Sequence, residues 1–243
     1  MRQVILISVL LLSFPFSGYS FDENYPPFDL KVFKDRMSNA APINKPYEKG
    51  EFRDKDLTIS WVTKVPQSSV VEIRYKTKLV AKVELPGSDD HSDFLGEVFY
   101  TDIDGNGLSD VIIHPAFYGG GLGSFYKTTI ILFQTKPGRF RRLDFTSFYF
   151  DPRDFVDLKG SGHYQLLIMQ LADGITRHNF WTYSTYRIKD FNLVMDKKSF
   201  PSFPKFIQYT ERPNNTPTNK LTEKQKIDFL RTLPAVIKSK AVT

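Results

Sequence analysis

The chain has 243 residues, no cysteine and a formal net charge of +6, and 15% of its residues are aromatic. This composition is enough for a sizeable core in one or two domains, and it excludes disulfides and thiolate metal sites. Lysines and arginines are scattered among acids, with short basic clusters only at residues 139–142 and 197–198. A scattered basic surplus is typical of a solvated surface, so nucleic acid is not expected as a partner.

Residues 1–20 have the layout of a secretory signal peptide: Arg2, an apolar run, and then small or neutral residues that end at Ser20. The apolar run is about 13 residues long, shorter than the roughly 20 that span a bilayer. An uncleaved anchor is the alternative. We expect cleavage after Ser20 and, because no later segment could span, export to the periplasm or the outside.

Residues 21–55 are rich in proline and irregular, and they are expected to form an arm that lies over the body of the protein. A short helix is predicted over residues 29–37. From Asp56 the hydrophobic period changes to two, which predicts consecutive antiparallel strands over residues 57–62, 70–75 and 79–85.

A polar loop follows at residues 86–93, with several acids and His91. Its loose spacing favours a solvated loop over a second cation site.

The most informative stretch is residues 102–110, between two apolar segments. Side-chain oxygens occur at loop positions one, three, five and nine, and glycines at four and six permit sharp turns. Calcium takes about 6–8 oxygen ligands. The sequence therefore predicts a calcium site with water completing the shell, and its protein ligands are Asp102, Asp104, Asn106, the backbone carbonyl of Leu108, and Asp110.

This loop has two other interpretations: a plain acidic turn and an EF-hand. Asn106-Gly107 is a type I′ hairpin signal, so a plain acidic turn would also fit, although it does not require three aspartates at ligand spacing. An EF-hand does not fit, because Ile113 occupies the position of its bidentate glutamate and a strand leads into the loop.

The apolar strand, the D-x-D-x-[DN]-G-x-x-D loop of residues 102–110 and the apolar strand that follows resemble the calcium loop of FG-GAP/VCBS-type repeats. The match covers all nine loop positions and both flanks. This resemblance implies sheets like those of integrin-type propeller blades, and exported bacterial relatives that mostly have no assigned activity.

A second stretch, residues 157–165, has the same frame and begins 55 residues after Asp102. Asp157, two glycines and the apolar exit align, whereas Lys159 and Gln165 replace two ligands. We expect a worn copy of the repeat in which the Lys159 ammonium or simple hydrogen bonding replaces the cation. Coincidence in a glycine-containing hairpin is the alternative.

No other motif carries clear chemistry. The glycine cluster of residues 119–123 lacks the lysine of a phosphate-binding loop and is expected to be a rim loop. His91, His114, His163 and His178 form no metal motif, and no G-x-S-x-G is present.

Residues 199–220 read as a covering loop, and Thr222 with Gln225 forms a capping box for a C-terminal helix. Ile227 and Leu230 of this helix are expected to face the body.

Together these patterns predict an all-β, mainly antiparallel protein with propeller-blade-like sheets in an incomplete or small closed arrangement, plus a C-terminal helix. Its parts are a signal peptide (1–20), an arm (21–55), a β domain with two FG-GAP/VCBS-like repeats (56–198) and a covering loop with the helix (199–243).

The function expected is that of an exported, calcium-stabilised binding or structural protein whose partner is a protein or an envelope or glycan component. The alternative is a hydrolase that acts on a glycan or phosphoester, with acids of residues 86–93, Asp110 and His114 meeting near residues 119–123.

Overall fold

The structure is a computed structural model. The predicted signal peptide, most of the polar loop at 86–93 and the glycine cluster at 119–123 lie outside the residues that it describes. The described residues are 31–32, 42–45, 48–64, 68–86, 95–116, 126–148, 150, 154–159, 164–172, 180–208, 221–232 and 240–241.

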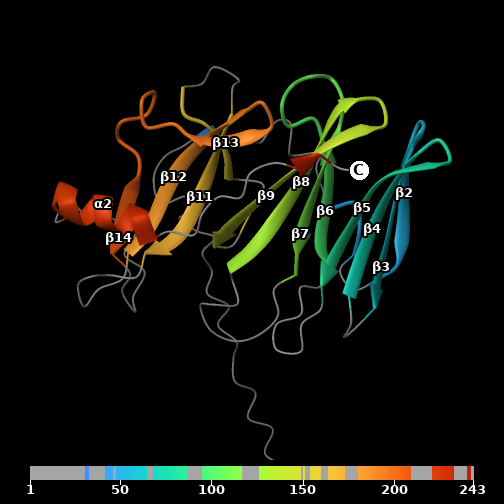
Figure 1. The fold of residues 1–243 in the computed structure, drawn as a ribbon, viewed down its shortest axis with the longest axis horizontal. Coiled ribbons are helices and arrows are strands. Elements are labelled where there is room, and N and C mark those ends of the chain that lie inside the picture. Colours follow the sequence, from blue (N-terminus) through green and yellow to red (C-terminus); the bar gives the residue numbers. More distant parts are fainter. Residues whose placement is uncertain are drawn as a thin grey trace, which may run out of the picture.

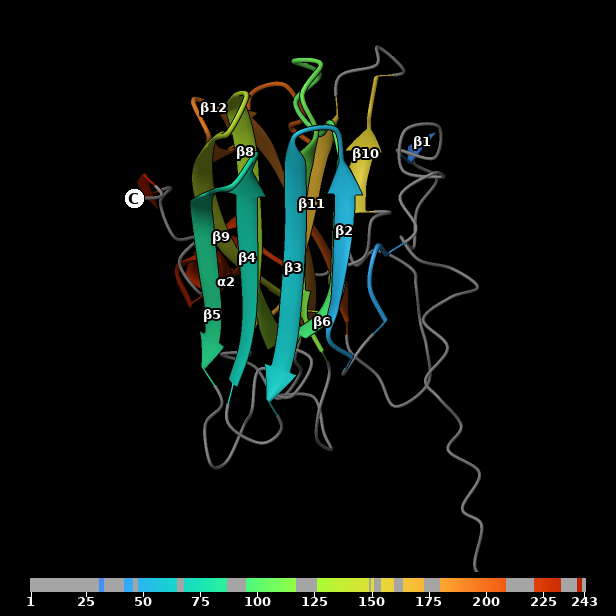
Figure 2. The ribbon, with the colours of Figure 1, turned by 90° about the vertical axis from the view of Figure 1, so that its right-hand side faces the viewer.

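The protein is all-β, as predicted, and is built from three antiparallel sheets that lie side by side (Figure 1). The first sheet is a four-stranded meander, and Figure 2 shows it face on. In β4, buried and half-buried residues alternate, as expected for a sheet with only one face covered. The strands of the first sheet are β2 (Gly50–Asp54), β3 (Leu57–Lys64), β4 (Ser68–Tyr75) and β5 (Lys78–Pro86).

The middle sheet is a second meander, with a short C-terminal strand added at its edge next to β9. Its strands are β6 (Leu95–Thr101), β7 (Asp110–Pro115), β8 (Tyr126–Lys136), β9 (Arg139–Phe148) and β15 (Lys240–Ala241).

The third sheet is another meander, and two short strands extend it: β1 pairs with β10, and β14 pairs with β12 beyond the end of β13. Its strands are β10 (Phe155–Asp157), β11 (Gln165–Ala172), β12 (Phe180–Lys189), β13 (Asn192–Met195), β1 (Lys31–Val32) and β14 (Lys205–Gln208).

The middle sheet is covered on both faces, which explains the uninterrupted apolar run in β7. Val111 and Ile113 belong to the core shared with the first sheet, whereas Ile112 belongs to the core shared with the third. All three are fully buried. A polar side chain on either face of this sheet is therefore removed from water when the protein folds.

The C-terminal helix α2 (Glu223–Thr232) begins with the predicted capping box. The Gln225 N–H donates to the Thr222 hydroxyl at 3.3 Å, and the Thr222 N–H donates to Gln225 Oε1 at 2.9 Å. Leu230 packs against a small apolar cluster that includes Phe180 and Phe206, as expected. The prediction for Ile227 is wrong, because this side chain is 49% exposed and the helix contacts the body through its Leu230 side.

Two sheet edges are contacted by parts of the predicted N-terminal arm. Lys31 and Val32 pair with β10, so they form a strand and not part of the helix expected over 29–37. At β6, the buried Asn44 replaces a neighbouring strand: its Nδ2 donates to the Gly96 carbonyl at 2.8 Å, and its Oδ1 accepts the Val98 N–H at 2.7 Å.

The first sheet also begins earlier than Asp56, because β2 starts at Gly50. The sequence gives little sign of β2, since Gly, Asp and, to a lesser degree, Glu are unfavourable in strands. Pairing with β3 orders this segment. The tight β2–β3 turn is marked by Lys55, which has a φ of 51°.

We predict that Asn44→Ala destabilises the protein by about 2–4 kcal/mol, because it leaves a buried carbonyl and a buried N–H without partners. Thermal unfolding measures the effect. Asn192→Ala, which removes a hydrogen bond to the Asp190 carbonyl at an exposed turn, is the control and should cost less than about 1 kcal/mol. Equal effects of the two substitutions would contradict the claim that Asn44 stabilises the protein by hydrogen-bonding the edge of β6.

Candidate metal centre

The aspartate loop, residues 102–110, joins β6 to β7 at one end of the middle sheet. The strands are paired up to Thr101 and Asp110, so the chain makes a wide loop between these residues and not a two-residue turn at Asn106-Gly107. Gly105 and Gly107 have φ angles of 77° and 83°, in the left-handed region where a side chain is strained. Both glycines therefore serve the wrapped shape predicted for a cation loop.

Asp102 organises the loop by accepting backbone N–H groups from its far side. Its Oδ1 accepts from Gly105 at 2.8 Å and from Asn106 at 3.1 Å, and its Oδ2 accepts from Gly107 at 2.9 Å. A carboxylate that accepts several N–H bonds fixes the loop backbone around itself, because these donors have no strand partner to bind.

Asp104 and Asn106 form a second layer of contacts. Asp104 Oδ1 accepts the Asn106 N–H at 3.1 Å, and Asp104 Oδ2 accepts from the Asn106 amide at 3.2 Å. Asn106 Oδ1 accepts the Leu108 N–H at 2.7 Å, so a lone pair of this oxygen remains for a ligand. Coordination by Asn106 and by the Leu108 carbonyl stays a prediction.

Asp110 is fully buried. Its Oδ2 accepts the Ile103 N–H at 2.9 Å, and its Oδ1 accepts the Gln134 N–H at 2.8 Å. Among the described residues, no lysine or arginine forms an ion pair with it. Burial raises the pKa of Asp110 to about 8, helped by the neighbouring charges of Asp104 and Asp102 and opposed by the two N–H bonds.

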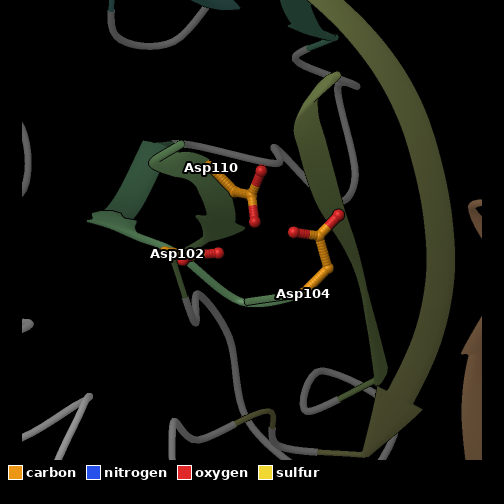
Figure 3. Close-up of side chains that lie close together, drawn as sticks. All are labelled: Asp102, Asp104 and Asp110. Atoms are coloured by element: carbon orange, nitrogen blue, oxygen red, sulfur yellow. The ribbon is translucent and has the colours of Figure 1, made fainter. Parts of the chain in front are cut away.

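The three carboxylates converge. Asp102, Asp104 and Asp110 each offer an oxygen, and these oxygens lie within 4.8 Å of one another. Figure 3 shows the Asp104 and Asp110 carboxylates facing each other, with Asp102 beside them. Oxygens that bind one calcium ion at about 2.3–2.6 Å lie at most about 5 Å apart, so the residues fit a shared cation. Burial first, and then the charge of Asp102, raises the pKa of Asp104 as well.

The second loop occupies the equivalent place in the third sheet. In the middle sheet Thr101 pairs with Asp110, and in the third sheet Val156 pairs with Gln165, which lies 55 residues after Asp110. The next two strands are also in equivalent register, because Val111 pairs with Leu132 and Leu166 pairs with Tyr186. The two meanders therefore share one strand order and one pairing pattern.

One hydrogen bond within the aspartate loop has a counterpart within the second loop. Gln165 Oε1 accepts the Leu158 N–H at 3.4 Å, just as Asp110 accepts the N–H of Ile103 in the aspartate loop. The Lys159 ammonium, the expected replacement for the cation, has its Nζ over the Phe200 ring, 5.2 Å from the centroid, which weighs against that role. Hydrogen bonding by the Gln165 amide is the part of that expectation that fits.

The hydrolase alternative named Asp110 and His114, which lie on the same strand. The register pairs Asp110 with Thr101 and His114 with Glu97, so the two residues are at opposite ends of β7. His114 Nδ1 lies 3.0 Å from the Thr129 hydroxyl, and its ring contacts Phe150. Asp110 and His114 are therefore not brought together; the loops expected to complete that site lie outside the described residues.

Sequence reasoning missed Gln134, the residue of β8 that borders the loop. Its backbone carbonyl accepts from the Asn106 amide at 3.0 Å, in addition to its N–H bond to Asp110. The sequence offers only a weak signal, since Gln134 is the first of three polar residues after the apolar run of residues 130–133; the structure shows that its side chain is 6% exposed. A buried amide in such a strand needs polar partners.

Comparisons with known proteins returned nothing: no family model, no curated protein and no solved structure matches this chain. In the described part of the chain, no helix is both long enough and apolar enough to traverse a bilayer.

We predict that the calcium-free protein loses stability as pH rises from about 4 to 8. The pKa of Asp110 is about 8 in the folded protein and 3.8 as a free side chain, so the folded state binds more protons between these values. The stabilisation is complete below the lower pKa and is lost as pH approaches the higher one.

Melting curves with a chelator at pH 5, 6, 7 and 8 measure this trend. Saturating calcium should make the decline shallower, because the cation stabilises the charged carboxylate. If the melting temperature measured with chelator does not change between pH 5 and pH 8, the raised pKa of a buried, cation-free Asp110 is contradicted.

Proposed function

We propose that this is an exported β-repeat protein that calcium stabilises at the aspartate loop, with a binding or structural role. The observation that carries this proposal is Asp110, a fully buried carboxylate that faces two other carboxylates and has no cationic side chain beside it among the described residues. A cation at their meeting point would convert mutual repulsion into attraction.

Calcium is the best match to the donors. All of the predicted ligands are oxygens, as calcium and magnesium prefer, and the chain has no thiol for softer metals. A loop that wraps with carboxylates, an amide and a backbone carbonyl suits the high and flexible coordination number of calcium. Magnesium usually retains several waters and is held by only one or two carboxylates.

The role of this cation would be structural. The loop joins β6 to β7 and contacts β8 through Gln134, and the middle sheet carries the cores on both of its faces. Ile103, the second loop residue, is itself 6% exposed and belongs to the core shared with the third sheet. Order in the loop would thus be transmitted to the packing of the sheets.

The resemblance to FG-GAP/VCBS repeats is supported by the equivalent register of the middle and third sheets and by a loop between the first two strands of each. A fold by itself does not specify a reaction, so the resemblance suggests a scaffold and not an activity.

The proposed location is the periplasm or the outside of the cell, and the proposed partner is a protein or an envelope or glycan component. The basic cluster near residue 140 is engaged within the protein, which weighs against nucleic acid as the partner. Arg142 binds Asp144 at 2.7 and 2.9 Å, and Arg141 lies over the Phe191 ring at 5.2 Å. The hydrolase stays the second candidate, and the separation of Asp110 from His114 weighs against it.

We predict that calcium at 100 times its Kd stabilises the protein by about 2.7 kcal/mol, a rise in Tm of about 5–10 °C for a chain of this size. Asp102→Asn together with Asp104→Asn should abolish the rise, because it removes two charges from the site. Asp144→Asn, on β9 and paired with Arg142, is the control and should leave the rise intact. Identical melting curves with calcium and with chelator would refute calcium binding.

We also predict that the exported protein begins at Phe21, because the signal peptide is removed after Ser20. Intact-mass measurement of protein from the periplasmic or extracellular fraction tests this. A mass that includes residues 1–20, found in the membrane fraction, would show an uncleaved anchor instead.

A further inference from the structure

Gln134 lies beside the aspartate loop and holds it from two directions. Its N–H donates to Asp110 Oδ1 at 2.8 Å, and its carbonyl accepts from Asn106 Nδ2 at 3.0 Å. These two backbone contacts fix the position of β8 relative to the fifth and ninth residues of the loop.

The side chain of Gln134 adds a third and a fourth contact. In the amide orientation that satisfies its neighbours, Nε2 donates to the Ser109 carbonyl at 3.0 Å, and Oε1 accepts the Gly138 N–H at 3.1 Å. Ser109 is the residue before Asp110, and Gly138 lies in the turn between β8 and β9. The buried amide therefore joins the end of the aspartate loop to a turn that contains no predicted ligand.

That turn lies against the first sheet. Gly138 has a φ of 70°, and a Cβ at this position would lie only 2.6 Å from Cγ of Tyr75, which ends β4. On β6, beside the loop, the Tyr100 hydroxyl donates to Asp54 Oδ2 of the first sheet at 3.0 Å. A continuous set of contacts thus runs from the aspartate loop through Gln134 and Gly138 to Tyr75.

The third sheet offers a natural comparison. Gln134 pairs with Phe140 in the β8–β9 hairpin, and at the equivalent register of β12–β13 Ile188 pairs with Leu193. The sheet whose loop has lost two of its ligand positions has an apolar residue where the middle sheet has Gln134. The buried amide and the acidic loop therefore occur together.

We propose that Gln134 is a positioning residue for the cation site: it presets Asp110 and couples cation binding to the β8–β9 turn and the first sheet. The inference rests on the proposed function. Gln134 itself would not touch the cation, since its contacts are to Asp110, Asn106, Ser109 and Gly138. Residues that orient metal ligands typically change metal affinity by about 10–100-fold when they are replaced.

The test is a calcium titration by calorimetry on the full mature chain. Gln134→Met keeps the length of the side chain and removes both amide contacts, so the Kd for calcium should rise by about 10-fold or more. Gln170→Met is the matched control, because Gln170 is a glutamine of the third sheet that is 1% exposed. The Kd of the Gln170→Met variant for calcium should stay within about twofold of the wild-type value, because Gln170 lies outside the aspartate loop.

A second measurement separates coupling from general weakening. In amide NMR spectra of the wild-type protein, calcium should shift the Gly138 resonance, although Gly138 is not a ligand. In Gln134→Met this shift should disappear even at saturating calcium. A purely structural loss of stability would not remove the response of one turn in the folded, calcium-loaded protein.

The outcomes separate the two claims. If wild-type protein binds no calcium, the proposed function fails, and this inference fails with it. If wild type binds calcium and Gln134→Met binds it equally well, the inference fails and the proposed function stands. Should the variant not fold, the wild-type spectrum still decides, because a Gly138 resonance indifferent to calcium overturns the coupling.

Discussion

The structure depends on how the charge of Asp110 is accommodated inside the protein. This carboxylate begins β7, in a sheet whose two faces are both covered, and it is fully buried. Its two backbone N–H bonds offset part of the desolvation cost, and its neighbours Asp102 and Asp104 add repulsion. Either a proton or a cation must balance this group, and the loop brings the three carboxylates close enough together to share a cation.

The middle sheet connects the charge balance at Asp110 to the packing of the whole protein. It contributes to the cores on both sides, so disorder at the aspartate loop would reach the first and third sheets together. The third sheet has the same meander, and at the register position of Asp110 its Gln165 accepts the Leu158 N–H without adding a charge. At equivalent register positions of neighbouring sheets, the described residues thus include a neutral amide in one sheet and a buried carboxylate in the other.

The sequence predicted what is local and periodic. Alternating residues and turn signals indicated most strands, the ligand spacing indicated the convergence of Asp102, Asp104 and Asp110, and Thr222 with Gln225 marked the helix start. It could not predict contacts between distant segments. Asn44 seals β6 from 54 residues away, Lys159 turns to Phe200, and the environment of Gln134 depends on the β8–β9 turn. Pairing with β3 likewise orders β2 despite its unfavourable residues.

The central claim is that one divalent ion lies between Asp102, Asp104 and Asp110. The most direct measurement is a crystal structure of protein grown with calcium, with data collected where calcium scatters anomalously. One strong anomalous peak is expected about 2.3–2.6 Å from an oxygen of each of these carboxylates. Converging carboxylates with no anomalous peak between them, in crystals saturated with calcium, would contradict it.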